Sequence, residues 1–376
     1  MLRRHAPQRF ATRSARQANK WFGLLLLVAV GCVPGKVAAD HLVLRDLTSL
    51  VGVTVTQVDA DGVLLVGARR IGWDRLRFGQ VAPELQTEFD RQLAEVGLPL
   101  YRLRNRLEIG DHQGLAELAA SLEPAYRDSD SNTARLIRLA AFRGHLASGR
   151  RAAAAVAWLG LKRSTALPID ALESRLPWPQ RSPDGLWSPE LPPIWFDSEE
   201  AAAALDDAIA QVAANPTPHA VDRLLLASLA IAAGRPAVAM EQVAAIPQVT
   251  AAEEDWIAVL RVQDDRVSLR QSSAFDELRQ RLDAIDVRVR PLALYELGRA
   301  QLATPGPTGI RSGLLTLLQV PAEHPQAAAD LIGAALYSAA EALLASDRSN
   351  SARRLQQELR ERHAPSWHAR FAAFPN

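Results

Sequence analysis

The side chains that could carry acid–base chemistry in this 376-residue chain are carboxylates grouped in three short clusters. The clusters are Glu199-Glu200, Asp206-Asp207 and Glu253-Glu254-Asp255. Two neighbouring carboxylates can act as the acid and the base of glycoside hydrolysis. Nothing in the sequence selects one pair, however, and all three clusters fall in segments with helical periodicity. We therefore expect solvated helix faces here rather than a catalytic pair.

Histidines and glycine-rich motifs give no stronger indication of catalysis. His363 and His368 are close together, but they are five positions apart and Pro365 lies between them. That spacing places two side chains on different faces of a helix, so we expect solvated or capping histidines and no metal site. The chain also lacks the G-x-S-x-G, P-loop, G-x-G-x-x-G and H-E-x-x-H motifs. The sequence therefore predicts a protein that is not an enzyme and that has no cofactor.

Large aromatic side chains in a proline-rich segment, residues 164–198, are the best candidates for partner binding. Seven prolines exclude a continuous helix from this segment. These rings could fill grooves between helices and join two halves of the molecule, or one or two could bind a partner peptide or a sugar ring. We predict an ordered strap or linker at a domain boundary, and call residues 164–198 the strap. Its candidate rings are Trp178, Trp187, Trp195 and Phe196.

Residues 1–39 have the order of regions that is typical of a secretory signal. Basic residues without an acid lead into a mostly apolar run over residues 21–33, and Pro34-Gly35 then breaks the run. Val37-Ala38-Ala39 offers the small residues after which signal peptidases cut. The apolar run is shorter than the roughly 20 residues that span a bilayer. We predict cleavage after Ala39 and export to the periplasm or the extracellular space.

The only cysteine of the chain, Cys32, gives an alternative. Ala29-Val30-Gly31-Cys32 resembles the lipobox of bacterial lipoproteins, in which a small residue precedes the cysteine. Lipidation at Cys32 would make the protein a membrane-anchored lipoprotein. Cleavage after Ala39 would instead leave a chain without cysteine, and therefore without a disulfide or a thiolate metal site.

Removal of the signal changes the charge of the chain. Residues 1–39 contain seven of the 43 Lys and Arg residues and none of the 42 Asp and Glu residues, which leaves a formal net charge of −6. Nucleic-acid binding rests on phosphate neutralisation by basic groups, so we expect no nucleic-acid partner. We also expect contact with the membrane only through the signal or through a lipid at Cys32.

Residues 40–80 have the pattern of a small β-module. Alternation of valine with glycine and threonine over 51–56 predicts a strand, and Asp59-Ala60-Asp61-Gly62 predicts a turn. Residues 63–66 predict a second strand, and a third is expected at 71–74. We expect a meander or SH3-like module that packs on the first helices, with Trp73 as its core anchor.

The pattern becomes helical after Pro83. Apolar residues recur at three-to-five spacing from Leu85 onwards. Capping signals mark several helix starts: Ser198 before two glutamates, and Thr250 with Glu253 as a capping box. Gly234-Arg235-Pro236 marks the end of one helix and the start of the next.

Two predicted helical hairpins resemble tetratricopeptide repeats. Ala140 and Ala152 are 12 residues apart, as are Ala340 and Ala352, and this is the spacing of the two small packing positions of that family. The resemblance implies a mainly α fold of stacked helical hairpins, an α-solenoid with a concave face that binds another protein. The period between copies is not constant, and the family's aromatic positions mostly hold leucine here.

These observations predict five segments: a signal peptide over 1–39, a β-module over 40–80, a helical-hairpin region over 81–163, the strap over 164–198 and a repeat domain over 199–376. We expect an exported, non-enzymatic protein-interaction or scaffold protein of the cell envelope or periplasm. The alternative is a glycan-binding or glycan-acting envelope protein that uses the tryptophans of the strap. A third expectation is a structural subunit of a larger assembly.

Overall fold

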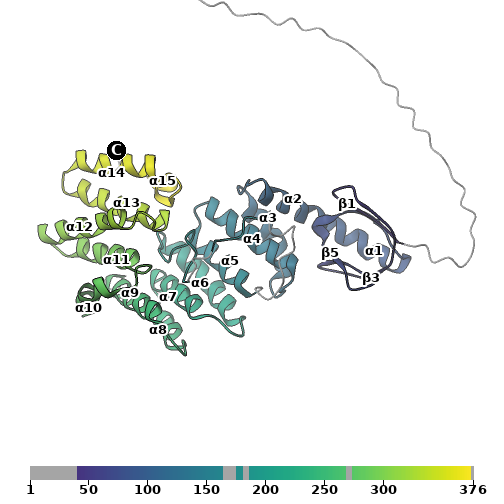
Figure 1. The fold of residues 1–376 in the computed structure, drawn as a ribbon, viewed down its shortest axis with the longest axis horizontal. Helices are drawn as coiled ribbons and strands as arrows, with labels where there is room; N and C mark the ends of the chain where they lie inside the picture. The colour runs from purple at the N-terminus through teal and green to yellow at the C-terminus, as the bar shows by residue number, and fades with distance from the viewer. Residues whose placement is uncertain (1–39, 164–174, 181–185, 268–272, 374–376) are drawn as a thin grey trace, which may run out of the picture. The chain divides into compact units, whose positions relative to one another are not determined.

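The computed structural model describes residues 40–163, 175–180, 186–267 and 273–373 (Figure 1). The predicted signal, with its cleavage site at Ala39 and the alternative lipidation site at Cys32, lies outside these residues. Within the described residues, no helix combines the length and the apolar character that a membrane crossing needs. The chain is mainly helical and has a small antiparallel sheet region at its N-terminal end.

The β-module contains two three-stranded antiparallel sheets, with strand orders β2-β1-β6 and β3-β4-β5. The predicted hairpin turn is confirmed, because Asp59 pairs with Gly62 where β3 meets β4. The single strand expected over 51–56 is wrong, because the two sheets separate at Thr54, between β2 and β3. The strand expected at 71–74 ends at Ile71 and gives way to a 3-10 turn, η1 (Trp73–Arg75). The strands are β1 (Asp40–Leu44), β2 (Ser49–Val53), β3 (Val55–Asp59), β4 (Gly62–Leu65), β5 (Arg70–Ile71) and β6 (Leu76–Gln80).

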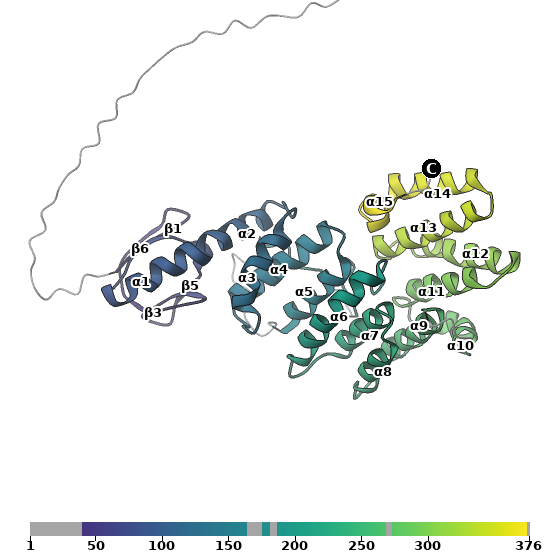
Figure 2. The same ribbon diagram turned by 180° about the vertical axis from the view of Figure 1, so that it is seen from behind.

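Trp73 is the core anchor of the β-module, as the sequence predicts. Its side chain is fully buried, and its indole Nε1–H donates a hydrogen bond of 2.8 Å to the carbonyl of Asp59. The ring centroid lies 5.5 Å from that of Phe89, which is buried on the first helix. The module therefore shares its core with that helix, α1 (Pro83–Gln92), which lies against the strands in both views (Figures 1 and 2).

A nearly continuous helical segment leads out of the β-module. Helix α1 passes through a π-helical turn, η2 (Leu93–Gly97), into α2 (Leu98–Glu108). Two arginines tie this segment back to the module. Arg104 forms a 2.6 Å ion pair with Asp74, and Arg45 donates to the carbonyl of Gly97 at 3.2 Å.

The remaining helices pack mostly against their neighbours in chain order, as both views show (Figures 1 and 2). Each helix from α3 to α7 contacts the next, and the contacts then run through α9 and α11 to α14. These helices are α3 (Leu115–Tyr126), α4 (Asn132–Ala147), α5 (Arg151–Arg163), α6 (Ser198–Ala213), α7 (Ala220–Ala232), α8 (Pro236–Ala244), α9 (Ala251–Val267), α10 (Ala274–Arg281), α11 (Arg290–Ala303), α12 (Pro307–Glu323), α13 (Ala329–Ala345), α14 (Ser349–Arg362) and α15 (Trp367–Phe371).

Small residues allow these helices to approach closely. A Cβ atom built on Gly144 of α4 would lie 2.2 Å from the backbone nitrogen of Ala116 on α3. The alanines of the two tetratricopeptide-like copies are all buried, two on the adjoining helices α4 and α5 and two on α13 and α14. They are Ala140, Ala152, Ala340 and Ala352.

Helix ends follow the predicted capping signals with one correction. The capping box at α9 is confirmed, because Thr250 N–H donates to the Glu253 carboxylate at 2.7 Å and Glu253 N–H donates to the Thr250 hydroxyl at 3.4 Å. Ser198 is not the cap of α6. Asp197 caps that helix, accepting hydrogen bonds from the backbone N–H groups of Glu199 and Glu200.

Candidate functional site

Two arginines hold the described part of the strap against the first helices. Arg143, on α4, donates to the carbonyls of Pro177 at 2.7 Å and Trp178 at 3.1 Å and pairs with Glu190. Arg151, at the start of α5, is 2% exposed and donates to the carbonyls of Ile194 and Pro192. Because every one of these acceptors belongs to the strap, the described part of the strap is held on the helical surface.

The four candidate rings of the strap do not form one surface. Trp195 is buried, and its indole N–H donates to the Ser228 hydroxyl at 2.9 Å. Trp187 meets the buried Trp256 edge-on, with ring centroids 5.1 Å apart. Phe196 packs against the C-terminal region, and Trp178 lies under the guanidinium of Arg135. The structure therefore places each ring against a different helix or pair of helices.

The C-terminal helix α15 lies on the turn between α4 and α5. The indole N–H of Trp367 donates to the carbonyl of Gly149 at 2.7 Å, and Arg370 donates to the carbonyl of Ala147 at 2.9 Å. Gly149 has φ +77°, a conformation that glycine adopts readily, and a Cβ there would lie 3.0 Å from the Trp367 indole nitrogen. Residues more than 200 positions apart in the sequence are thus in direct contact.

A buried ion pair joins the same regions. Arg151 pairs with Asp330 near the start of α13, and the second oxygen of Asp330 accepts the backbone N–H of Trp367 at 2.6 Å. A solenoid in which each repeat contacts only its neighbours would not make such contacts. The strap, the α4–α5 turn and the C-terminal helices are therefore in contact with one another.

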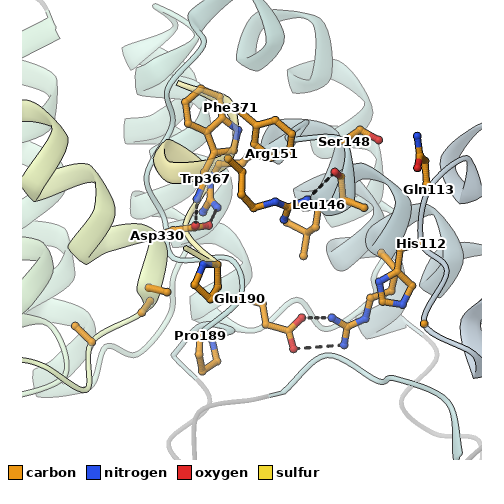
Figure 3. A pocket seen from close by; sticks show the side chains of 18 of the residues that line it. His112, Gln113, Leu146, Ser148, Arg151, Pro189, Glu190, Asp330, Trp367 and Phe371 are labelled. Atoms are coloured by element: carbon orange, nitrogen blue, oxygen red, sulfur yellow. Dashed lines mark hydrogen bonds and ion pairs between the residues drawn. The ribbon is translucent and has the colours of Figure 1, made fainter. Parts of the chain in front are cut away.

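A hollow of about 1080 Å³ opens where these segments meet (Figure 3). We call it the Trp367 hollow. Its walls come from the loop before α3, the α4–α5 turn, the strap, the α12–α13 connection and α15. Residues that line it include His112, Arg143, Arg151, Glu190, Asp330, Trp367, Arg370 and Phe371.

Most of the charges that line the Trp367 hollow are neutralised within the protein. Arg143 pairs with Glu190 and Arg151 with Asp330. Figure 3 labels Glu190, Arg151 and Asp330 among the residues around the hollow. Within the described part of the chain, none of the ion pairs involves Arg370, whose guanidinium lies 4.7 Å from the centre of the Phe371 ring. A cation and an aromatic ring are thus available to a ligand.

His112 is the titratable group of this hollow that has an unsatisfied atom. Its Nε2 is buried and has no hydrogen-bond partner among the described residues. Burial, and then the positive charge of Arg143, lower the pKa of His112. Burial therefore favours the neutral form of this imidazole.

A second, mostly apolar hollow of about 430 Å³ adjoins the first. We call it the Trp187 hollow, after the strap tryptophan that lines it together with Val287, Pro325 and Leu331. The two hollows share the rim residues Pro189, Gln326, Ala327 and Ala328. We call the two together the strap groove.

The strap groove has the features of a binding site. Its serine, Ser148, donates its hydroxyl proton to the carbonyl of Gly144 at 2.6 Å and is bound to no base. The described residues contain no group of three or more His, Cys, Asp or Glu side chains arranged to hold a metal ion. What the groove offers is concave surface, the exposed ring of Phe371, the half-buried ring of Trp187 and the guanidinium of Arg370.

Glu199, Asp206, Asp207 and Glu254 are exposed, as expected for solvated helix faces, whereas two other members of the carboxylate clusters and His368 correct expectations from the sequence. Asp255 is buried and accepts hydrogen bonds from Arg281 and from the backbone N–H of Asp286, and Glu200 accepts from the first turn of α5. His368 is also buried rather than solvated. The groups that cover these side chains come from other elements: Arg281 of α10 and the Asp286 backbone for Asp255, α5 for Glu200, and the strap and α13 for His368.

Sequence reasoning did not single out the polar residues of the strap groove. In the sequence, Arg143 and Arg151 look like ordinary surface charges. Trp187 is a sequence candidate that does line the groove, whereas the aromatic pair Trp367 and Phe371 near the C-terminus is a local signal that was missed. In comparisons with known proteins, no protein-family model, curated protein or solved structure matches the chain.

Proposed function

We propose that this chain is an exported, non-enzymatic interaction protein that binds an extended segment of a partner protein in the strap groove. The observation that carries the proposal is the adjacency of the two hollows. The Trp187 hollow suits an apolar side chain, and the Trp367 hollow next to it offers Arg370 and Phe371 to an acidic or polar one.

The internal ion pairs of the groove support this function. Arg143 and Arg151 are already paired, so a partner need not remove their charges from water. The hollow walls are therefore positioned before a ligand arrives, which lowers the entropic cost of binding. Export is supported by the signal-like order of residues 1–39.

Site-specific photo-crosslinking in the producing cells tests this function. A photoreactive residue would replace Val287 or Gln326 at the groove, or Met240 on α8 as an exposed control. We expect the same partner to be captured from both groove positions and not from Met240. Capture from Met240 alone, or of different proteins at the two groove positions, would contradict the proposal.

A substitution that fills the groove, compared with the same substitution outside the groove, gives the matched control for the crosslink. Ala327 lines both hollows, so Ala327→Trp should abolish the crosslink, whereas Ala345→Trp on the exposed side of α13 should leave it intact. Mass spectrometry of the same samples reports the mature N-terminus. An N-terminus at Asp40 supports cleavage after Ala39, and a lipidated N-terminus at Cys32 supports the lipoprotein alternative.

A glycan ligand is the second candidate, because Trp187 is half-buried and presents part of its ring to a hollow. Aromatic faces of this kind can stack on sugar rings. Titration with peptidoglycan fragments should then shift the tryptophan fluorescence of the protein but not that of Trp187→Ala. If neither protein responds, the glycan candidate is excluded.

A further inference from the structure

A third hollow, of about 310 Å³, lies away from the strap groove. It lies between the turn that follows β3, the 3-10 turn η1 and the N-terminal end of α4, and we call it the Asp61 hollow. The strap residues Leu176 and Trp178 line one part of it, together with Leu136. Its volume is at the small end of the range for ligand pockets, which begins near 300 Å³.

Hydrogen-bond donors without partners line the Asp61 hollow. In the first turn of α4 the Ser131 hydroxyl accepts from Ala134 N–H at 3.2 Å, which leaves the N–H groups of Asn132 and Thr133 without an acceptor in their own helix. Arg104 uses two of its nitrogens on Asp74 and Glu108, whereas its Nη2 is buried without a partner.

The Thr133 hydroxyl adds to these donors, because Thr133 lines the hollow and is only 6% exposed. A buried polar atom such as Arg104 Nη2 normally has a partner, and one without a partner calls for an explanation. Together with the positive end of a 16-residue helix, these groups favour a carboxylate at this end of the hollow.

An acceptor without a partner lines the same hollow. The Oδ1 atom of Asp61 is buried and accepts no hydrogen bond from the described residues. Three arginines, Arg70, Arg75 and Arg104, and two aspartates, Asp61 and Asp74, line the hollow. An ammonium group would pair with the unpartnered Oδ1 of Asp61. The hollow therefore combines groups for a carboxylate and for an ammonium with an apolar wall.

We propose that the Asp61 hollow binds a free α-amino acid with an apolar side chain. The carboxylate accepts from the first-turn N–H groups and the hydroxyl of α4, the ammonium donates to Asp61, and the side chain packs on Leu176 and Trp178. This site is separate from the strap groove, so its test does not depend on the function proposed above.

Isothermal titration calorimetry on the purified protein tests the site with three ligands. The ligands are L-leucine, N-acetyl-L-leucine, which has no ammonium, and L-leucinamide, which has no carboxylate. We expect leucine to bind and each blocked form to bind at least about tenfold more weakly, because each loses one charge-assisted contact. Equal binding of the three ligands, or no binding of leucine, would overturn the proposal.

Matched variants assign the ammonium contact. Asp61→Asn should weaken leucine binding by about tenfold or more and leave the weak binding of N-acetyl-leucine unchanged. Asp46→Asn, at an exposed aspartate outside the hollow, should bind leucine like the wild type. If Asp61→Asn does not fold, as judged by its thermal unfolding, the comparison of the three ligands on the wild-type protein still decides.

Discussion

His368 is buried in an aromatic cluster near the C-terminus. Its ring centroid lies 4.2 Å from that of Phe196, 4.6 Å from Tyr337 and 5.1 Å from Trp367. Burial, and then the positive charges of Arg151 and Arg299, lower the pKa of His368 to about 3. The folded protein therefore holds this imidazole neutral at pH values where an exposed histidine is charged.

We predict that this histidine makes the protein less stable as the pH falls. Its ordinary pKa of about 6.5 applies to the unfolded chain, so between pH 6.5 and 3 the unfolded state binds a proton that the folded state does not. The free energy of unfolding should drop by about 2 kcal/mol from pH 7 to pH 5 through His368 alone. Urea unfolding of the wild type and of His368→Phe at both pH values measures this difference.

His145 contributes in the same direction, because burial lowers its pKa to about 4. The variant His368→Phe should therefore keep part of the pH dependence. His219→Gln, at an exposed histidine, is the control and should behave like the wild type. An identical drop in the wild type and in His368→Phe would show that His368 is not buried as described.

Glu200 shows how one residue can cap a helix other than its own. It lies on α6, yet its carboxylate accepts from the N–H groups of Ala152 at 2.9 Å and Ala153 at 3.2 Å in the first turn of α5. We predict that Glu200→Ala lowers the free energy of unfolding by roughly 1–2 kcal/mol. Glu200→Gln should lose less, because its amide oxygen still accepts. Urea unfolding measures both, and Glu199→Ala at the exposed neighbour should have little effect.

At the scale of elements, the contact between α13 and α14 tests the repeat-like packing. Ala352 is fully buried, and Ala340 on the facing helix is 1% exposed. We predict that Ala352→Leu overpacks this contact and costs roughly 1–3 kcal/mol of stability. Thermal unfolding should show a lower melting temperature for Ala352→Leu and almost no change for Ala345→Leu, at an exposed position of α13. Equal melting temperatures would mean that Ala352 is not in the contact between these helices.

The strap is an element without regular secondary structure over most of its described length. Its order comes from side chains of other elements, since Arg143 and Arg151 donate to its carbonyls. Prolines lack the backbone N–H groups that bond to carbonyls in a helix or a sheet. In the strap, the two arginine side chains donate to the carbonyls instead. The same donors set the position of Trp187 and Pro189 at the groove.

At the scale of the whole molecule, the pair Arg151–Asp330 connects the first helices to the last. The two residues are 179 positions apart, and Arg151 is almost completely buried. Removing one partner of a buried pair leaves an uncompensated charge, which typically costs about 3–5 kcal/mol. We predict a loss of this size for Asp330→Ala, measured by chemical unfolding.

The double variant Arg151→Met/Asp330→Ala is the informative comparison. It removes the uncompensated charge, so it should lose less stability than the sum of the two single variants. Asp206→Ala, an exposed acid on α6, is the control. Strict additivity would show that the two side chains do not interact in solution.

Residues close together in the sequence determined several turns, helix ends and core positions. The turn over residues 59–62, the capping box at Thr250 and the buried Trp73 all follow from residues close to one another in the chain. Such signals succeed because turns and caps depend on backbone groups within three or four residues. The alternation over 51–56 failed because the break at Thr54 depends on which strands pair, and β1 and β6 are brought together from distant parts of the module.

Only the tertiary structure decided where the candidate sites lie. The aromatic rings of the strap were predicted as a set, but packing separated them among different helices. The strap groove forms because Arg151, Asp330 and Trp367 are in contact although they come from distant parts of the sequence. No local sequence pattern indicates that contact. A short-range signal reports the conformation of one element, whereas a hollow and its charges depend on how several elements pack.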